Sequence, residues 1–114
     1  MKEIKILFLW KIGRFINFYS KKTDNIVMMV SNYLSYYYGN SYKFSLSNVN
    51  LMKKLYIYFP IYNTFIEKLD WNLLKKILIL NKKECYFYFR IILLCHSNSY
   101  ELEKLINTNI YFRI

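Results

Sequence analysis

Apolar side chains recur every three or four residues along most of the chain, which is the spacing of helices that bury one face. Strand-like alternation is rare, and the sequence contains one proline and two glycines. The predicted helices span residues 3–19, 24–38, 45–59, 71–80 and 82–95, with a helical turn at 62–68 and a last helix from 98. We therefore expect an all-α fold, a compact bundle of six to seven short helices in one domain over residues 1–114.

Local start and stop signals support several of these boundaries. Asp24 and Asp70 precede periodic apolar segments and are expected N-caps, because a short polar side chain can accept the free N–H groups of a first helical turn. Gly39-Asn40 is a typical stop for the second helix. Asn98 and Glu101 have the spacing of a capping box, which indicates that the last helix begins there.

The segment from Phe44 to Pro60 is the most informative part of the chain. A helix there starts at Ser45 or Ser47 and must end by Phe59, because the residue before a proline disfavours helical backbone. On a helical wheel one arc carries Asn48 and the apolar residues Val49, Met52, Leu55, Tyr56 and Phe59. The opposite side carries Ser47, Asn50, Lys53 and Lys54. A capped helix with a polar, cationic outer face is typical of the reading helix of a helix-turn-helix.

The amino-acid composition affects how strongly the net charge indicates an anionic partner. Phe, Tyr, Met, Ile, Asn and Lys make up 67 residues, whereas Gly, Ala, Arg and Pro make up 6. The enriched residues have AT-rich codons, so a biased genome is the simplest explanation for this composition. The net charge of +10 favours an anionic partner, although codon bias accounts for part of it. The 13 tyrosines are scattered without a repeat, which favours codon bias over base stacking.

Several function classes find little support in the sequence. No segment has the roughly 20 mostly apolar residues of a membrane span, and no signal peptide is recognisable, so we expect a cytoplasmic protein without membrane partners. Cys85 and Cys95 lie ten positions apart and are interpreted as free, buried thiols. His96 has no carboxylate, serine or second histidine at a useful spacing. Neither a cofactor nor a metal ion is expected.

Four segments in order resemble a known family. They are Leu9 to Arg14 (LWKIGR), the Phe44 to Pro60 segment, Leu69-Asp70-Trp71 with Leu74 and Leu78, and Asn98 to Ile106. Their order and spacing resemble the N-terminal domain of the bacterial YhcG-type proteins, which is usually followed by a PD-(D/E)XK nuclease domain. Leu46 and Leu51 stand where that family often has arginines, and Lys53 keeps a cation. This departure predicts weak binding dominated by phosphates.

The resemblance implies a DNA-binding or targeting module of a nuclease system. The catalytic Asp and Glu-x-Lys set that would hold Mg²⁺ is not found, so we do not interpret the chain as an enzyme. Ser47, Asn50, Lys53 and Lys54 are expected to face the DNA groove. Lys43 and Lys11 are expected auxiliary phosphate contacts. Cleavage would come from a separate or lost nuclease domain.

Two other interpretations stay open. The predicted helix 82–95 is apolar nearly all round, which predicts an exposed apolar patch with Ile91 and Ile92 that suits a homodimer or a separate nuclease domain. In that case the chain is an interaction module and its lysines are simply solvated. The chain could also be the non-functional product of a truncated gene. The sequence leaves open whether the helices near residues 45–71 or the later pair form the helix-turn-helix.

Overall fold

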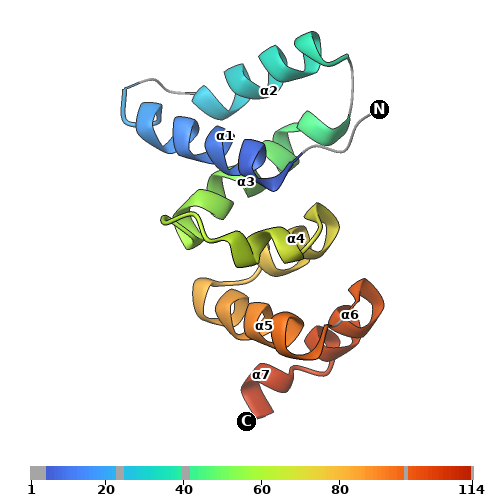
Figure 1. The fold of residues 1–114 in the computed structure, drawn as a ribbon. Coiled ribbons are helices and arrows are strands. Elements are labelled where there is room, and N and C mark those ends of the chain that lie inside the picture. The colour runs from blue at the N-terminus through green and yellow to red at the C-terminus, as the bar shows by residue number, and fades with distance from the viewer. Residues whose placement is uncertain (1–4, 23–24, 40–41, 97, 114) are drawn as a thin grey trace. The chain divides into compact units, whose positions relative to one another are not determined.

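The computed structural model describes residues 5–22, 25–39, 42–96 and 98–113 (Figure 1). Over these residues it contains seven α-helices and two short 3₁₀ segments, and no strand. The helices are α1 (Ile6–Tyr19), α2 (Ile26–Tyr37), α3 (Leu46–Tyr58), α4 (Trp71–Leu78), α5 (Lys82–Cys95), α6 (Ser99–Asn107) and α7 (Ile110–Arg113), and the 3₁₀ segments are η1 (Tyr42–Phe44) and η2 (Thr64–Lys68). The predicted all-α bundle of six to seven helices is confirmed.

The helices group into two compact units, residues 1–62 and residues 63–114. Unit 1 contains α1, α2, η1 and α3, and unit 2 contains η2 and the four later helices. Each unit has buried apolar side chains contributed by its own helices. The assignment of residues 1–114 to one functional domain stays a prediction.

In unit 1, α3 packs closely against α1 and also contacts α2. Helices α1 and α3 approach each other at Gly13, where an added methyl group would overlap the carbonyl oxygen of Met52. Ile16 and Met52 are fully buried beside this crossing. Trp10 donates its indole N–H to the carbonyl oxygen of Phe59 over 2.7 Å. Trp10 is therefore a buried core residue that links α1 to the end of α3.

The predicted start of α3 and the predicted ends of the helices in unit 1 hold, whereas α1 and α2 begin later than predicted, with Lys5 and Asn25 as their N-cap residues. Ser45 is the N-cap of α3, and its hydroxyl accepts the N–H of Asn48 over 3.3 Å. The helix ends before Phe59 and Pro60, as the proline requires. Gly39 follows α2 with a φ of 85°, which confirms the predicted left-handed stop. The predicted cap Asp24 lies outside the described residues.

In unit 2, three helices begin with the same side-chain cap. Asp70, Asn81 and Asn98 each accept the backbone N–H of the third residue that follows, over 2.8 to 2.9 Å. The predicted starts at Asp70 and Asn98 are confirmed. Lys76 of α4 and Glu103 of α6 form an ion pair of 2.9 Å at the surface, an arrangement that contributes little to stability.

Tyr88 of α5 is the largest fully buried side chain of unit 2. Burial raises the pKa of its hydroxyl above the ordinary value, the negative charge of Glu84 adds to the rise, and a backbone hydrogen bond at Tyr111 opposes it. Trp71 of α4 is only half-buried, unlike Trp10. Its indole N–H is buried and has no hydrogen-bond partner among the described residues.

Candidate nucleic-acid interface

The outer face of α3 carries the residues expected to contact DNA. Ser47 and Asn50 are exposed, whereas Lys53 and Lys54 are half-buried. The inner side of the helix is fully buried through Val49, Met52 and Leu55. The division of α3 into an inner apolar side and an outer polar side therefore agrees with the predicted wheel.

The same outer face is more apolar than expected. Leu46, Asn50, Lys53 and Ile57 follow one another at intervals of three or four residues, which places them on one stripe of the helix. Leu46 and Ile57 are exposed. Asn50 and Lys53 therefore lie between two apolar side chains, which can contact sugar or thymine methyl groups but cannot neutralise phosphate.

The cations of α3 have no acidic neighbours in the described part of unit 1. The only acidic residues of this unit are Glu3 and Asp24, and both lie outside the described residues. The ammonium group of Lys54 lies 5.9 Å from the ring centroid of Tyr58, within reach of a cation–π interaction. That contact leaves the ammonium charged and able to meet a phosphate.

The two auxiliary residues lie on different elements. Lys43 belongs to η1, directly before α3, and is half-buried. Lys11 is exposed on α1, where it lines a hollow with Arg14, Asn17 and Tyr56. The amide of Asn17 donates to the carbonyl oxygen of Lys53 over 3.2 Å, so the crossing of α1 and α3 lies at the edge of this hollow. The structure thus brings Lys11 and the backbone of Lys53 to one seam.

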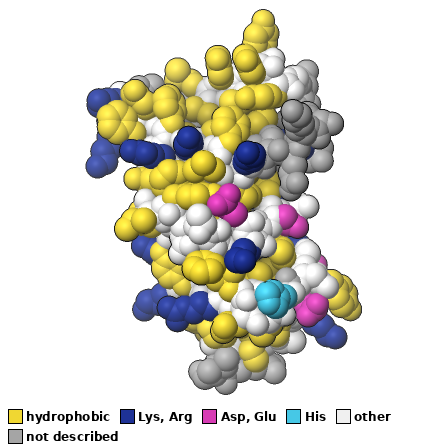
Figure 2. All heavy atoms as spheres, in the orientation of Figure 1, with side chains coloured by type: hydrophobic (Ala, Val, Ile, Leu, Met, Phe, Trp, Pro, Cys, Tyr) yellow, Lys and Arg dark blue, Asp and Glu magenta, His cyan; other side chains and the backbone are white. Residues whose placement is uncertain are grey.

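Arg14, Asn17 and Tyr56 are the members of this seam that the sequence did not assign to a site. Lys11 and Arg14 are three residues apart on α1, and this spacing places both on one helix face. Figure 2 shows a row of Lys and Arg side chains among hydrophobic ones across the part of the surface that α1 occupies in Figure 1. The contribution of Tyr56 depends on the pairing of α1 with α3, for which the sequence carries no local signal.

Connection lengths bear on the open question of the helix-turn-helix. Such motifs join their two helices by three or four residues. Residues 59–70 connect α3 to α4, which is three times that length, whereas residues 79–81 connect α4 to α5. The later pair thus has the expected connection. The case for α3 accordingly rests on the cations of its outer face and not on a tight turn next to it.

The predicted interaction surface on α5 needs a correction. Ile92 is 4% exposed and belongs to the core, together with Cys85 and Tyr88 on the same side of the helix. Ile91 is half-buried, and the exposed apolar residue nearby is Leu94, at 81%. The pattern did not reveal which side of an all-round apolar helix is covered, because neighbouring helices decide it.

The end of α5 brings a second correction. Cys95 is exposed, whereas Cys85 is buried as expected, and neither forms a disulfide. The neighbouring His96 is exposed and has a left-handed backbone with a φ of 52°. Among the described residues, no three His, Cys, Asp or Glu side chains are placed to hold a metal ion. None of the described helices is both long and apolar enough to cross a bilayer.

No protein-family model, curated protein or solved structure matches the chain. The resemblance to the YhcG-type N-terminal domain stays a prediction based on the four quoted segments.

Proposed function

We propose that the chain binds DNA weakly, mainly through phosphates, and that α3 of unit 1 provides the principal contacts. In this role Ser47, Asn50, Lys53 and Lys54 face the groove, and Lys43 and Lys11 contact flanking phosphates. The resemblance to the YhcG-type family supports a targeting role in a nuclease system, with cleavage supplied by a separate domain. The chain itself is proposed to carry no catalytic site.

The observation that carries this proposal is the distribution of charge between the units. Unit 1 has nine Lys or Arg residues and two Asp or Glu residues, a net charge of +7. Unit 2 has eight and five, a net charge of +3. A unit with so few acidic residues cannot neutralise its own cations. It therefore attracts a polyanion and gains affinity by releasing the counterions of that polyanion.

The salt dependence of binding follows from the number of phosphate contacts. Four lysines at phosphates predict a slope of log K against log salt concentration of about −3 to −4. Raising salt from 50 to 200 mM should then weaken binding roughly 100-fold. A shallow slope of about −1 would contradict a phosphate-dominated interface on α3.

The specific role of α3 is tested by comparing two charge reversals in the full chain. Lys53→Glu with Lys54→Glu changes the proposed interface. Lys82→Glu with Lys83→Glu is the matched control on α5, because both pairs are consecutive lysines and each includes an ammonium 5.9 Å from a tyrosine ring centroid. Each double change lowers the net charge from +10 to +6. Lysine and glutamate have similar helix propensities, so both variants should fold.

The expected result in a gel-shift titration with duplex DNA is loss of the shift for the α3 variant and a largely retained shift for the α5 variant. Equal losses would mean that binding follows net charge alone. An unchanged shift in the α3 variant would refute the proposed interface. The nuclease association has its own test, a neighbouring reading frame that encodes the Asp and Glu-x-Lys set. If no such frame exists, the proposed nuclease association is refuted and the DNA-binding proposal is unaffected.

A further inference from the structure

The outward face of α1 carries two cations followed by three aromatic rings. Lys11, Arg14, Phe15, Phe18 and Tyr19 follow one another at helical spacing, Lys22 lies in the turn after the helix, and all six are exposed. Phe18 is the most exposed of the three rings, at 61%. The exposed parts of these rings are open to a ligand. Together with the neighbouring cations, they suit a ligand that has both flat apolar faces and negative charges.

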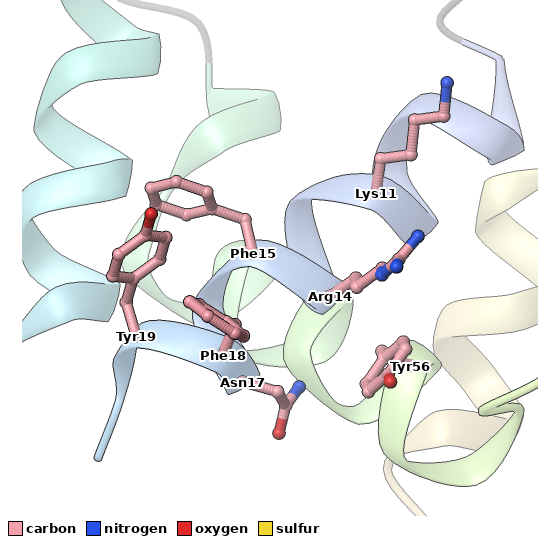
Figure 3. A pocket seen from close by; sticks show the side chains of 7 residues that line it. All are labelled: Lys11, Arg14, Phe15, Asn17, Phe18, Tyr19 and Tyr56. Carbon is pink, nitrogen blue, oxygen red and sulfur yellow. The ribbon is translucent and has the colours of Figure 1, made fainter. Parts of the chain in front are cut away.

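Five of these residues surround the hollow at the α1–α3 seam, which has a volume of about 620 Å³ and is open to solvent. Figure 3 shows Phe15, Phe18 and Tyr19 on one side, and Lys11, Arg14 and Tyr56 on the other. Asn17 lies at the lower edge, fixed by hydrogen bonds from its amide to the carbonyl oxygens of Gly13 and Lys53. The hollow therefore has an aromatic side and a cationic side.

The rings hold one another in place. The centroids of Phe15 and Tyr19 are 4.5 Å apart, and those of Phe18 and Tyr19 are 4.9 Å apart with planes at 76°. Tyr19 thus supports both phenylalanines, and their outer faces stay exposed. The ammonium of Lys22 lies 4.9 Å from the centroid of Phe18. A base stacked on Phe18 would displace this ammonium from the ring. The ammonium could then pair with the phosphate of the same nucleotide.

We infer that this hollow binds single-stranded nucleic acid, with one base stacked on Phe18 and the adjoining phosphates paired with Lys11, Arg14 and Lys22. Stacking on aromatic side chains with cations along the backbone is the usual chemistry of single-strand binding. The inference rests on the proposed function for the claim that unit 1 meets nucleic acid. It adds a second ligand class, because duplex DNA hides the faces of its bases, and a surface on α1 that shares Lys11 with the proposed duplex contacts.

The arrangement fits a nucleic acid better than a membrane surface. A helix that lies on a bilayer separates an apolar face from a charged one. On α1 the cations Lys11 and Arg14 share one exposed face with the rings at 15, 18 and 19, and Lys22 follows in the turn after the helix. The rings also line one side of a hollow. A hollow suits a flat base that inserts between side chains better than it suits a bilayer surface.

The test measures fluorescence anisotropy of a labelled mixed-sequence oligodeoxynucleotide, alone and annealed to its complement, with the full-length chain. Phe18→Ala removes the stacking surface. Phe112→Ala is the matched control, a phenylalanine of unit 2 that is 69% exposed. Removing one stacking ring should weaken single-strand binding by roughly 5- to 100-fold, while duplex binding and the control stay unchanged. Phe18→Trp should restore binding, because it keeps a stacking face.

Three results would overturn the inference. They are equal affinities for Phe18→Ala and Phe112→Ala, failure of Phe18→Trp to restore binding, and binding to phosphatidylserine vesicles that Phe18→Ala removes while the single strand does not bind. If Phe18→Ala does not fold by circular dichroism, Phe15→Ala replaces it, because that ring is also about half exposed. The charge reversal at Lys53 and Lys54 separates the two proposals. Loss of duplex binding there without an effect of Phe18→Ala would leave the proposed function standing and remove this one.

Discussion

Replacing Gly13 by alanine should destabilise unit 1, although alanine is the better helix former. In an exposed helix the change would stabilise by about 1 kcal/mol. Here the added methyl group would overlap the carbonyl oxygen of Met52, lie 2.9 Å from the carbonyl carbon of the same residue, and lie 3.2 Å from the Cβ of Tyr56. Two of these three atoms belong to the backbone, so no side-chain rotation relieves the overlap. The helices α1 and α3 must separate.

The size of the effect follows from these opposing terms. Overpacking typically costs about 1–3 kcal/mol, and because backbone must move here we take about 3–5 kcal/mol for this site. Separation also loosens the contacts of Ile16 and Met52, which are fully buried at this crossing. After subtracting the helix-propensity gain, we expect a net loss of about 2–4 kcal/mol in the free energy of unfolding. For a chain of this length that loss lowers the melting temperature by roughly 8–20 °C.

Gly39→Ala is the matched control, because it adds the same methyl group where nothing lies within 4 Å. Its cost arises from the left-handed backbone, with a φ of 85°, and should be about 1–2 kcal/mol. Thermal and urea unfolding followed by circular dichroism compare both variants with the unmodified chain. If Gly13→Ala unfolds at the same temperature as the unmodified chain or above it, α1 and α3 do not cross at Gly13. The seam that brings Lys11 to Tyr56 would then be wrong as well.

Two further contrasts use pairs of like residues. Trp10→Phe removes the donor to the Phe59 carbonyl and should cost about 1–3 kcal/mol in urea unfolding, whereas Trp71→Phe removes a donor that has no partner among the described residues and should cost less than about 1 kcal/mol. Equal costs would contradict the different roles of the two indoles. A thiol reagent should label exposed Cys95 in the native chain and buried Cys85 only after denaturation, as mass spectrometry of peptides can show. Labelling of Cys85 under native conditions would refute its burial.

The parts of the fold that sequence predicts well are those set by a few neighbouring residues. Asp70 and Asn98 begin helices because their side chains accept an N–H three residues later, a bond that needs no tertiary contact. Pro60 ends α3 for an equally local steric reason. Gly39 supplies a left-handed stop at low cost. Such signals act within one turn of helix, so a few neighbouring residues are enough to predict these helix starts and stops.

The parts that sequence predicts poorly depend on which helices meet. Ile92 and Leu94 stand two positions apart in the same apolar helix, yet one is buried and the other exposed. Cys95 is exposed because it is the last residue of α5 and lies beyond the part of the helix that is covered. Gly13 is a weak helix former by propensity, and only the crossing with α3 explains its place. Codon bias hides these differences further, because it fills covered and exposed positions with the same apolar residues.

Codon bias also limits what the net charge of +10 means, but it does not explain where the charge lies. A bias toward lysine codons should place cations throughout the chain, and the two units indeed carry nine and eight Lys or Arg residues. The asymmetry comes from the acidic residues, two in unit 1 and five in unit 2. Lysine enrichment cannot produce it. The positive field of unit 1 therefore reflects acidic residues that are missing around α1 and α3, which is what a surface that meets phosphates requires.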